Sequence, residues 1–191
     1  MKLERQKILI DIDDTLLKSP DDLVNYEYRF EEKNTTQKEI NQMYQSDDSL
    51  ANIDFNDGAI DFILKYSKQF DIVFVSYGTE LNLMKKLAIL NDIFSYRYQL
   101  KNIYFAAFET GKANKSEILL DNTYIAIDSH SEHLAELNAP KKILLKNFQE
   151  TKDNITPIND EYIYIANSFK DIDEMISFDL KLKEMGVWLD A

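Results

Sequence analysis

Short apolar runs rich in β-branched residues alternate along this chain with stretches of helical periodicity, and this alternation constrains the fold more than any other feature. The runs lie at 7–12, 71–76, 103–108, 123–128, 143–145 and 162–166. Strands that alternate with helices favour a largely parallel sheet with helices on both faces. The sequence therefore predicts an α/β protein with a Rossmann-like three-layer core.

Capping signals and apolar spacing predict where the helices lie. One helix is expected from Pro20 to about 32, and a short second one begins near Thr36. Asp57 is expected to be the N-cap of the next helix, and Ser129 with Glu132 is expected to form a capping box at a later one. A short helix is also expected at 116–120. A long amphipathic helix runs from Ser168 to just before Gly186. The helix over 79–90 is predicted to carry one apolar face, made of Leu83, Met84, Leu87 and Leu90.

Composition and charge exclude several classes of function. The 191 residues carry 22 basic and 34 acidic side chains, a net charge of -12, which disfavours a binder of nucleic-acid polymers or anionic membranes. The absence of cysteine excludes disulfides and thiol catalysis. No apolar run is long enough to span a bilayer, and the chain is expected to be cytoplasmic. The oligomeric state is left open, with a homodimer among the options.

Polar residues stand at the ends of three predicted strands. Asp11 and Asp13 follow the first strand, Ser76 ends the second, and Asp128 ends the fourth. Because ligands of parallel sheets bind beyond the carboxyl ends of the strands, we expect these side chains to converge. Asp11 is suited to attack phosphorus, Asp13 to move the proton, Ser76 to donate to a phosphoryl oxygen, and Asp128 to bind Mg²⁺. The partner expected at this edge is a small phosphorylated substrate.

These residues resemble the motifs of the haloacid dehalogenase (HAD) superfamily of phosphatases. The Asp-x-Asp-x-Thr signature after an apolar strand matches Asp11, Asp13 and Thr15, and the second and fourth motifs match Ser76 and Asp128. The agreement in order and spacing covers residues 7–145. The resemblance implies an aspartyl phosphate on Asp11. It also implies a Mg²⁺ ion held by Asp11, Asp128 and the backbone carbonyl of Asp13.

The resemblance extends to a phosphate-binding lysine and to a cap. Lys115 is the predicted lysine, and Lys112 competes with it. Thr15 and Tyr77 are expected beside Ser76 at the phosphate. A small helical cap is expected at 18–54, between core segments 1–17 and 55–191. The arrangement is similar to the 5'(3')-deoxyribonucleotidase branch, which suggests a nucleotide as substrate. The cap residues that could then face a base are Tyr26, Tyr28, Arg29 and Phe30.

One departure from the family pattern supports an alternative function. Many members carry a second acid next to the fourth-motif aspartate, but Ser129 follows Asp128 here, and Glu132 is the acid at the longer spacing. A binding or regulatory protein that retains the fold without the chemistry is therefore the alternative to a hydrolase. Phosphoryl transfer to an acceptor other than water is also open.

Two metal-binding readings of the sequence are disfavoured. An EF-hand loop starting at Asp11 needs glycine at its sixth position and glutamate at its twelfth, where this chain has Leu16 and Asp22. His130 and His133 lie three apart, but the chain has no third histidine, so solvent-facing or capping roles are favoured for them.

Overall fold

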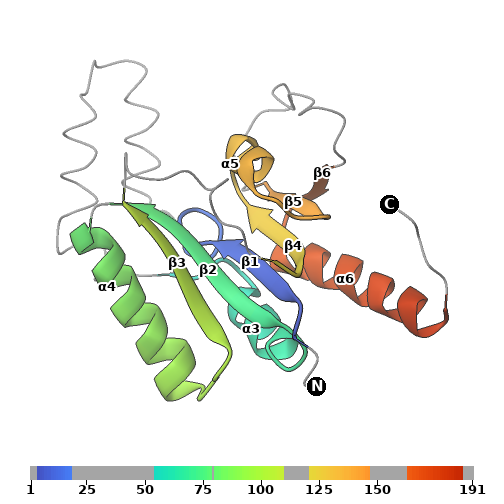
Figure 1. Ribbon diagram of the computed structural model, residues 1–191, viewed down its shortest axis with the longest axis horizontal. Helices are drawn as coiled ribbons and strands as arrows, with labels where there is room; N and C mark the ends of the chain where they lie inside the picture. Colours follow the sequence, from blue (N-terminus) through green and yellow to red (C-terminus); the bar gives the residue numbers. More distant parts are fainter. Residues whose placement is uncertain (1–3, 19–53, 79, 110–120, 147–162, 187–191) are drawn as a thin grey trace.

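A six-stranded sheet forms the centre of the molecule in the computed structural model, which describes residues 4–18, 54–78, 80–109, 121–146 and 163–186. The strand order is β3-β2-β1-β4-β5-β6, and all neighbouring pairs are parallel (Figure 1). This confirms the predicted α/β class. The strands are β1 (Lys7–Asp11), β2 (Asp71–Gly78), β3 (Ile103–Glu109), β4 (Thr123–Asp128), β5 (Lys142–Leu145) and β6 (Ile163–Ala166).

Helices cover both faces of the sheet. Alternate residues of β1 point to opposite faces, so Ile8 and Ile10 belong to one apolar cluster and Leu9 to the other. The first cluster contains buried side chains from α3 (Ala59–Tyr66), α4 (Glu80–Leu90), the π-helix η2 (Asn91–Arg97) and α6 (Phe169–Glu184). The second contains Leu134 of α5 (Ser131–Glu136). In Figure 1, α3 and α6 lie together against the sheet.

The predicted caps are correct at one helix and wrong at two. The side chain of Ser168 accepts a hydrogen bond of 3.2 Å from the backbone N–H of Asp171, so the start of α6 is confirmed. The N-cap of α3 is Gly58 instead of Asp57, because the chain enters the helix with a φ of 81°, which glycine adopts readily. The N-cap of α5 is His130, and Ser129 makes no capping bond there.

The predicted apolar face of α4 is also wrong. Leu90 is fully buried, but Met84 is 61% exposed and Leu87 is 41% exposed. Lys86 is only 4% exposed on the same helix. The helix is therefore rotated about its axis relative to the expectation, so that a lysine points inward where leucine and methionine were expected.

The described residues on either side of 19–53, a segment outside the described part of the chain, lie next to each other. Leu17 and Phe55 form an antiparallel bridge, and the N–H of Lys18 donates to the carbonyl of Asp54 at 2.9 Å. The helical cap at 18–54 and the short helix at 116–120 stay predictions. Within the residues described, no helix combines the length and apolar character needed to cross a bilayer.

Candidate active site

The reversal of strand order between β1 and β4 determines where a ligand can enter the sheet. From β1 the chain continues to β2 and β3 on one side, whereas β4, β5 and β6 lie on the other side. In open parallel sheets, ligands bind at this switch point, beyond the carboxyl ends of the strands. Asp11 ends β1 and Asp128 ends β4, and the pairing of Ile10 with Ile127 makes these two carboxylates neighbours across the switch point.

The turn after β1 is shaped by backbone hydrogen bonds. The N–H of Leu16 donates to the carbonyl of Asp11 at 3.2 Å, and the N–H of Leu17 donates to the carbonyl of Ile12 at 2.9 Å. Asp14 has a φ of 58°, a left-handed conformation that aspartate tolerates better than most residues. The side chain of Asn56 donates to the carbonyls of Asp14 and Thr15, at 3.2 and 2.7 Å. Asn56 therefore holds this turn in place from outside.

Thr15 connects the first and fourth strands. Its side chain is fully buried, and its hydroxyl donates to Asp11 Oδ2 at 3.5 Å while accepting a 2.8 Å hydrogen bond from the N–H of Ser129. One hydroxyl thus ties the turn that follows β1 to the end of β4. This contact fixes the spacing of Asp11 and Asp128, which are 6% and 0% exposed.

A buried lysine meets Asp13 and Ser76. Lys86 Nζ lies 2.5 Å from Asp13 Oδ2 and donates to Ser76 Oγ at 3.2 Å, and Ser76 Oγ donates to Asp13 Oδ2 at 3.2 Å. The side chains of Lys86 and Asp13 are 5% and 34% exposed. The three groups form a closed triangle in which Ser76 and the charged Lys86 are both buried, at 2% and 4% exposed. This triangle places a positive charge beside the carboxylates of a strongly acidic protein.

The two histidines of the chain lie against Asp128. Asp128 Oδ1 accepts a 2.9 Å hydrogen bond from the N–H of His130 and lies 3.7 Å from His130 Nδ1 and 3.5 Å from His133 Nδ1. Polar contact with Asp128 raises the pKa of the His130 imidazole to about 9, against the opposing effect of burial. The charges of Asp128, Asp11 and Asp14 act in the same direction. His130 therefore belongs to the same electrostatic environment as the carboxylates of the β1 turn.

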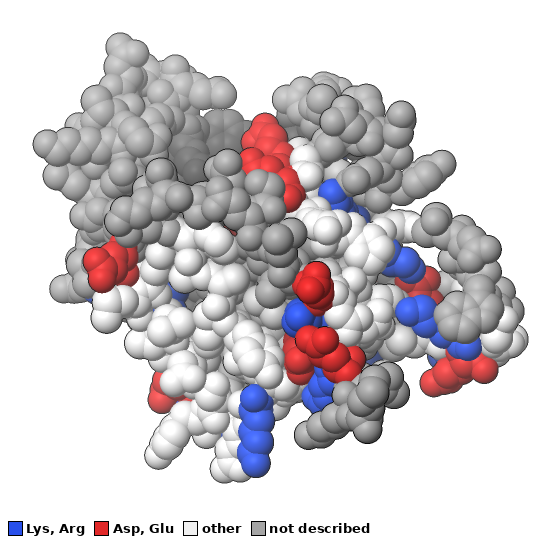
Figure 2. Space-filling view, in the orientation of Figure 1, with Lys and Arg blue, Asp and Glu red and all other residues white. Residues whose placement is uncertain are grey.

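The donor set of this edge fits a divalent cation. Asp11 and Asp128 supply two buried carboxylates next to each other at the switch point, and hard cations such as Mg²⁺ prefer oxygen ligands. Like charges this close are costly unless a cation or donors offset them. Acidic side chains also gather over α5 on the surface of this end of the molecule (Figure 2). The Mg²⁺ ligands that the family resemblance implies, Asp11, Asp128 and the carbonyl of Asp13, stay a prediction.

The described residues include part of the predicted site and exclude the rest. Asp11, Asp13, Thr15, Ser76 and Asp128 come together at one edge of the sheet. The residues that lie outside the described part are Lys112, Lys115, Tyr26, Tyr28, Arg29, Phe30 and the side chain of Tyr77.

Sequence reasoning missed two residues, Lys86 and Asn56. Lys86 follows Leu83 by three positions and precedes Leu90 by four, so a lysine on an apolar stripe was the available signal. Asn56 gave no signal beyond its place in a turn before α3. Its partners, Asp14 and Thr15, lie more than forty positions away in sequence.

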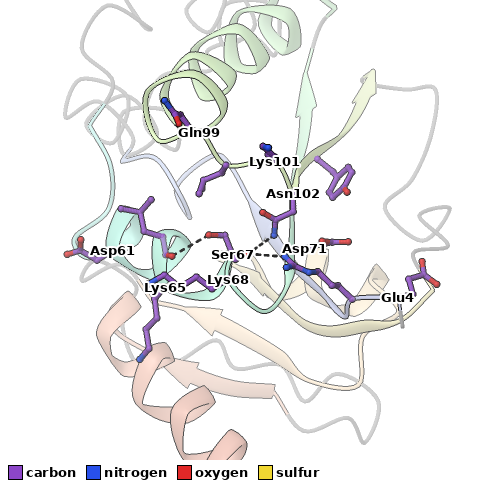
Figure 3. A pocket seen from close by; sticks show the side chains of 13 residues that line it. Glu4, Asp61, Lys65, Ser67, Lys68, Asp71, Gln99, Lys101 and Asn102 are labelled. Carbon is purple, nitrogen blue, oxygen red and sulfur yellow. Dashed lines mark hydrogen bonds between the residues drawn. The ribbon is translucent and has the colours of Figure 1, made fainter. Parts of the chain in front are cut away.

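A hollow of the described surface lies at the opposite edge of the sheet. It has a volume of about 1100 Å³ and is lined by residues near the amino ends of the strands, including Arg5, Asp71 and Asn102 (Figure 3). The side chains of Arg5 and Asn102 donate there to the carbonyl of Ser67, at 3.2 and 2.7 Å. These bonds tie the loop after α3 to the strands. None of the carboxylates of the candidate site lines this hollow.

Comparison with known proteins places the fold. No family profile and no curated protein matches the sequence. Among solved structures, the chain is similar to a haloacid dehalogenase-like family hydrolase from Xanthomonas campestris, with a TM-score of 0.54, 12% identity, and coverage of 92% of this chain and 96% of that one. An uncharacterised protein from Listeria monocytogenes gives a TM-score of 0.55 at 15% identity, covering 92% and 99%.

A third similar structure is YfnB from Bacillus subtilis, assigned as a HAD-hydrolase and solved bound to magnesium. Its TM-score is 0.50 at 17% identity, with coverage of 91% of this chain and 99% of that one. Taken with the strand order and the Asp-x-Asp-x-Thr turn after β1, these similarities define the class: the chain has the fold of the haloacid dehalogenase-like hydrolases.

Proposed function

We propose that this protein is a cytoplasmic, Mg²⁺-dependent hydrolase of small phosphomonoesters that acts through an aspartyl phosphate on Asp11. One observation carries the proposal: a buried aspartate pair, Asp11 and Asp128, lies beside the Asp13–Ser76–Lys86 triangle at the switch point of a HAD-like fold. Phosphoryl transfer needs a nucleophile, a proton donor and concentrated positive charge. This edge of the sheet supplies all three.

In the first step, an Asp11 carboxylate oxygen attacks phosphorus in line with the leaving oxygen. The phosphorus–oxygen bond to the substrate breaks, and Asp13 gives its proton to the departing alcohol. Thr15 holds Asp11 through its hydroxyl, which limits the rotation of the nucleophile. A bound Mg²⁺ would offset negative charge on the nucleophile and the phosphoryl oxygens.

In the second step, Asp13 takes a proton from water, and the water oxygen attacks phosphorus. The bond between phosphorus and Asp11 then breaks, which releases inorganic phosphate and restores the carboxylate. Asp13 must carry a proton in the first step, yet here it accepts hydrogen bonds from both Lys86 and Ser76. We infer that Lys86 and Ser76 turn from Asp13 to the phosphoryl oxygens when substrate enters, which frees Asp13 to act as an acid.

Lys86 is in this proposal a phosphate-binding lysine of the site. Its ammonium is already within reach of Ser76, the residue expected to donate to the phosphoryl group. Lys115 and Lys112 remain candidates for the same role.

Nucleotides are the substrate class to test first, because the chain resembles the 5'(3')-deoxyribonucleotidase branch in sequence. Transfer to an acceptor other than water would use the same aspartyl phosphate.

The test is turnover of p-nitrophenyl phosphate and a panel of nucleoside monophosphates with Mg²⁺ present. Asp11→Asn keeps the size of the side chain and removes the nucleophile, so we expect the rate to fall by about a thousandfold or more. Glu136→Gln, an exposed acid on α5, is the matched control and should keep the wild-type rate. Circular dichroism checks that both variants fold.

Two results would sink the proposal. Wild-type rates in Asp11→Asn would show that another group is the nucleophile. A wild-type protein that hydrolyses no ester and binds no Mg²⁺ by calorimetry would favour the non-catalytic binding module instead.

A further inference from the structure

We propose that Asp128, His130 and His133 form a binding site for a divalent transition-metal ion such as Mn²⁺, Co²⁺ or Zn²⁺. Each of the three offers one ligand atom, and these atoms all lie within 4.8 Å of one another. The carboxylate of Asp128 supplies the third ligand that the two histidines alone lack. Two imidazoles and one carboxylate are a set that such ions take in proteins, with positions left open for water or substrate.

Two of the distances between the ligand atoms are close to those around a bound ion. Ligands about 2.1 Å from an ion at tetrahedral or octahedral angles lie roughly 3.0–3.4 Å apart. Asp128 Oδ1 is 3.5 Å from His133 Nδ1 and 3.7 Å from His130 Nδ1. Shifts of a few tenths of an ångström would bring both histidine nitrogens to that distance from Asp128 Oδ1, and the ligand atoms of the two histidines lie within 4.8 Å of each other.

Local structure holds the three side chains close to one another. Asp128 ends a fully buried strand, and its carboxylate is fixed by the N–H of His130 at 2.9 Å. His130 is the N-cap of α5 and His133 lies three positions later in the helix, and Nδ1 of each ring lies within 3.7 Å of Asp128 Oδ1. Their rings lie 4.9 Å apart between centroids. Ser129 Oγ lies 3.0 Å from His130 Nδ1, so an ion bound to this nitrogen would replace that contact.

The two histidine ligands give this site a different metal preference from a site made of oxygen ligands alone. Mg²⁺ prefers oxygen ligands and water, whereas imidazole nitrogen suits later transition-metal ions such as Zn²⁺, so Co²⁺ and Zn²⁺ are expected to bind here more tightly than Mn²⁺. Asp128 also belongs to the set expected to hold Mg²⁺, so the inference specifies which ion the proposed active site takes most tightly. The inference rests on the proposed function only where it says that the bound ion serves catalysis. Binding of the ion can be measured without turnover.

The experiment is a Mn²⁺ titration of the full chain, with pulsed electron paramagnetic resonance to detect nitrogen coupled to the ion. We compare wild type with His130→Gln, His133→Gln and the double variant, and with Glu136→Gln as the surface control. Nitrogen coupling is expected in wild type and the control and should vanish in the double variant. Each single variant should bind Mn²⁺ at least about tenfold more weakly, since even the loss of an outer-shell partner costs 10–100-fold. Affinity for Mg²⁺ should change much less.

Two results would overturn the inference: no nitrogen coupling in the wild-type Mn²⁺ complex, or equal Mn²⁺ affinity in wild type and the double variant. Asp11→Asn separates this inference from the proposed function, because it should retain the nitrogen coupling while turnover is lost. A wild-type protein that shows nitrogen-coupled Mn²⁺ but hydrolyses no ester would leave the metal site standing and remove the phosphatase.

Discussion

Removing the charge of Asp13 should destabilise the protein more than removing the charge of its ion-pair partner, Lys86. Asp13→Asn removes the negative charge that pairs with Lys86, whose side chain is 5% exposed, and leaves its ammonium with two neutral acceptors, the new amide oxygen and the Ser76 hydroxyl. Removing one partner of a buried ion pair costs about 3–5 kcal/mol. The Asp13 side chain is 34% exposed, so solvent already screens the pair, and we take the lower end, about 3 kcal/mol.

Lys86→Met should be milder. Methionine has a similar length, and the space beside Lys86 is a cavity of about 10 Å³ with Phe74, Leu87 and Phe105 in its wall. The Asp13 carboxylate that remains is partly hydrated and still accepts from Ser76 at 3.2 Å. We expect a loss of about 1 kcal/mol, and about the same for the double variant, because no charge is then left buried.

Urea unfolding followed by circular dichroism measures these differences. With a slope of about 2 kcal/mol/M, Asp13→Asn should lower the midpoint by about 1.5 M and Lys86→Met by about 0.5 M. Adding Lys86→Met to Asp13→Asn should raise the midpoint again. The reasoning would be refuted if Lys86→Met were the more damaging change, or if the double variant lost the sum of the two single losses.

Two further predictions concern α6. Asp173 accepts hydrogen bonds from Lys65 Nζ and Tyr66 Oη, at 2.5 and 2.7 Å. Burial opposes the ionisation of Asp173, but these hydrogen bonds outweigh burial and lower the pKa of Asp173 below 3.8. Asp173→Asn should therefore be less stable than wild type at neutral pH, by up to about 1 kcal/mol. A lowered pKa stabilises only above the unfolded value, so this deficit should shrink in urea titrations as pH falls through 3.8 and below. Ser168→Ala removes the acceptor for the N–H of Asp171 and should cost about 1 kcal/mol, whereas Ser168→Asp should be nearly neutral in thermal melts.

Local features of the sequence were enough to predict the strands and the carboxylates of the site. The apolar run before Asp11 became β1, and the run ending at Asp128 became β4 over the predicted residues. Strand formation depends on neighbours in sequence, and a parallel sheet brings its carboxyl ends to one edge whatever lies between them. The convergence of Asp11 and Asp128 therefore followed from the order of the elements alone. The start of α6 at Ser168 was equally local.

The sequence by itself determined the class of fold and the identity of the acidic residues, because these depend on periodicity and on strand ends. Tertiary structure alone decided that Lys86 points inward while Met84 is exposed, and that two histidines lie against Asp128. The physical reason is that the rotation of a helix about its axis is set by packing against the sheet. A sequence pattern specifies which residues share a face of a helix, and contact with the rest of the molecule selects which face is buried.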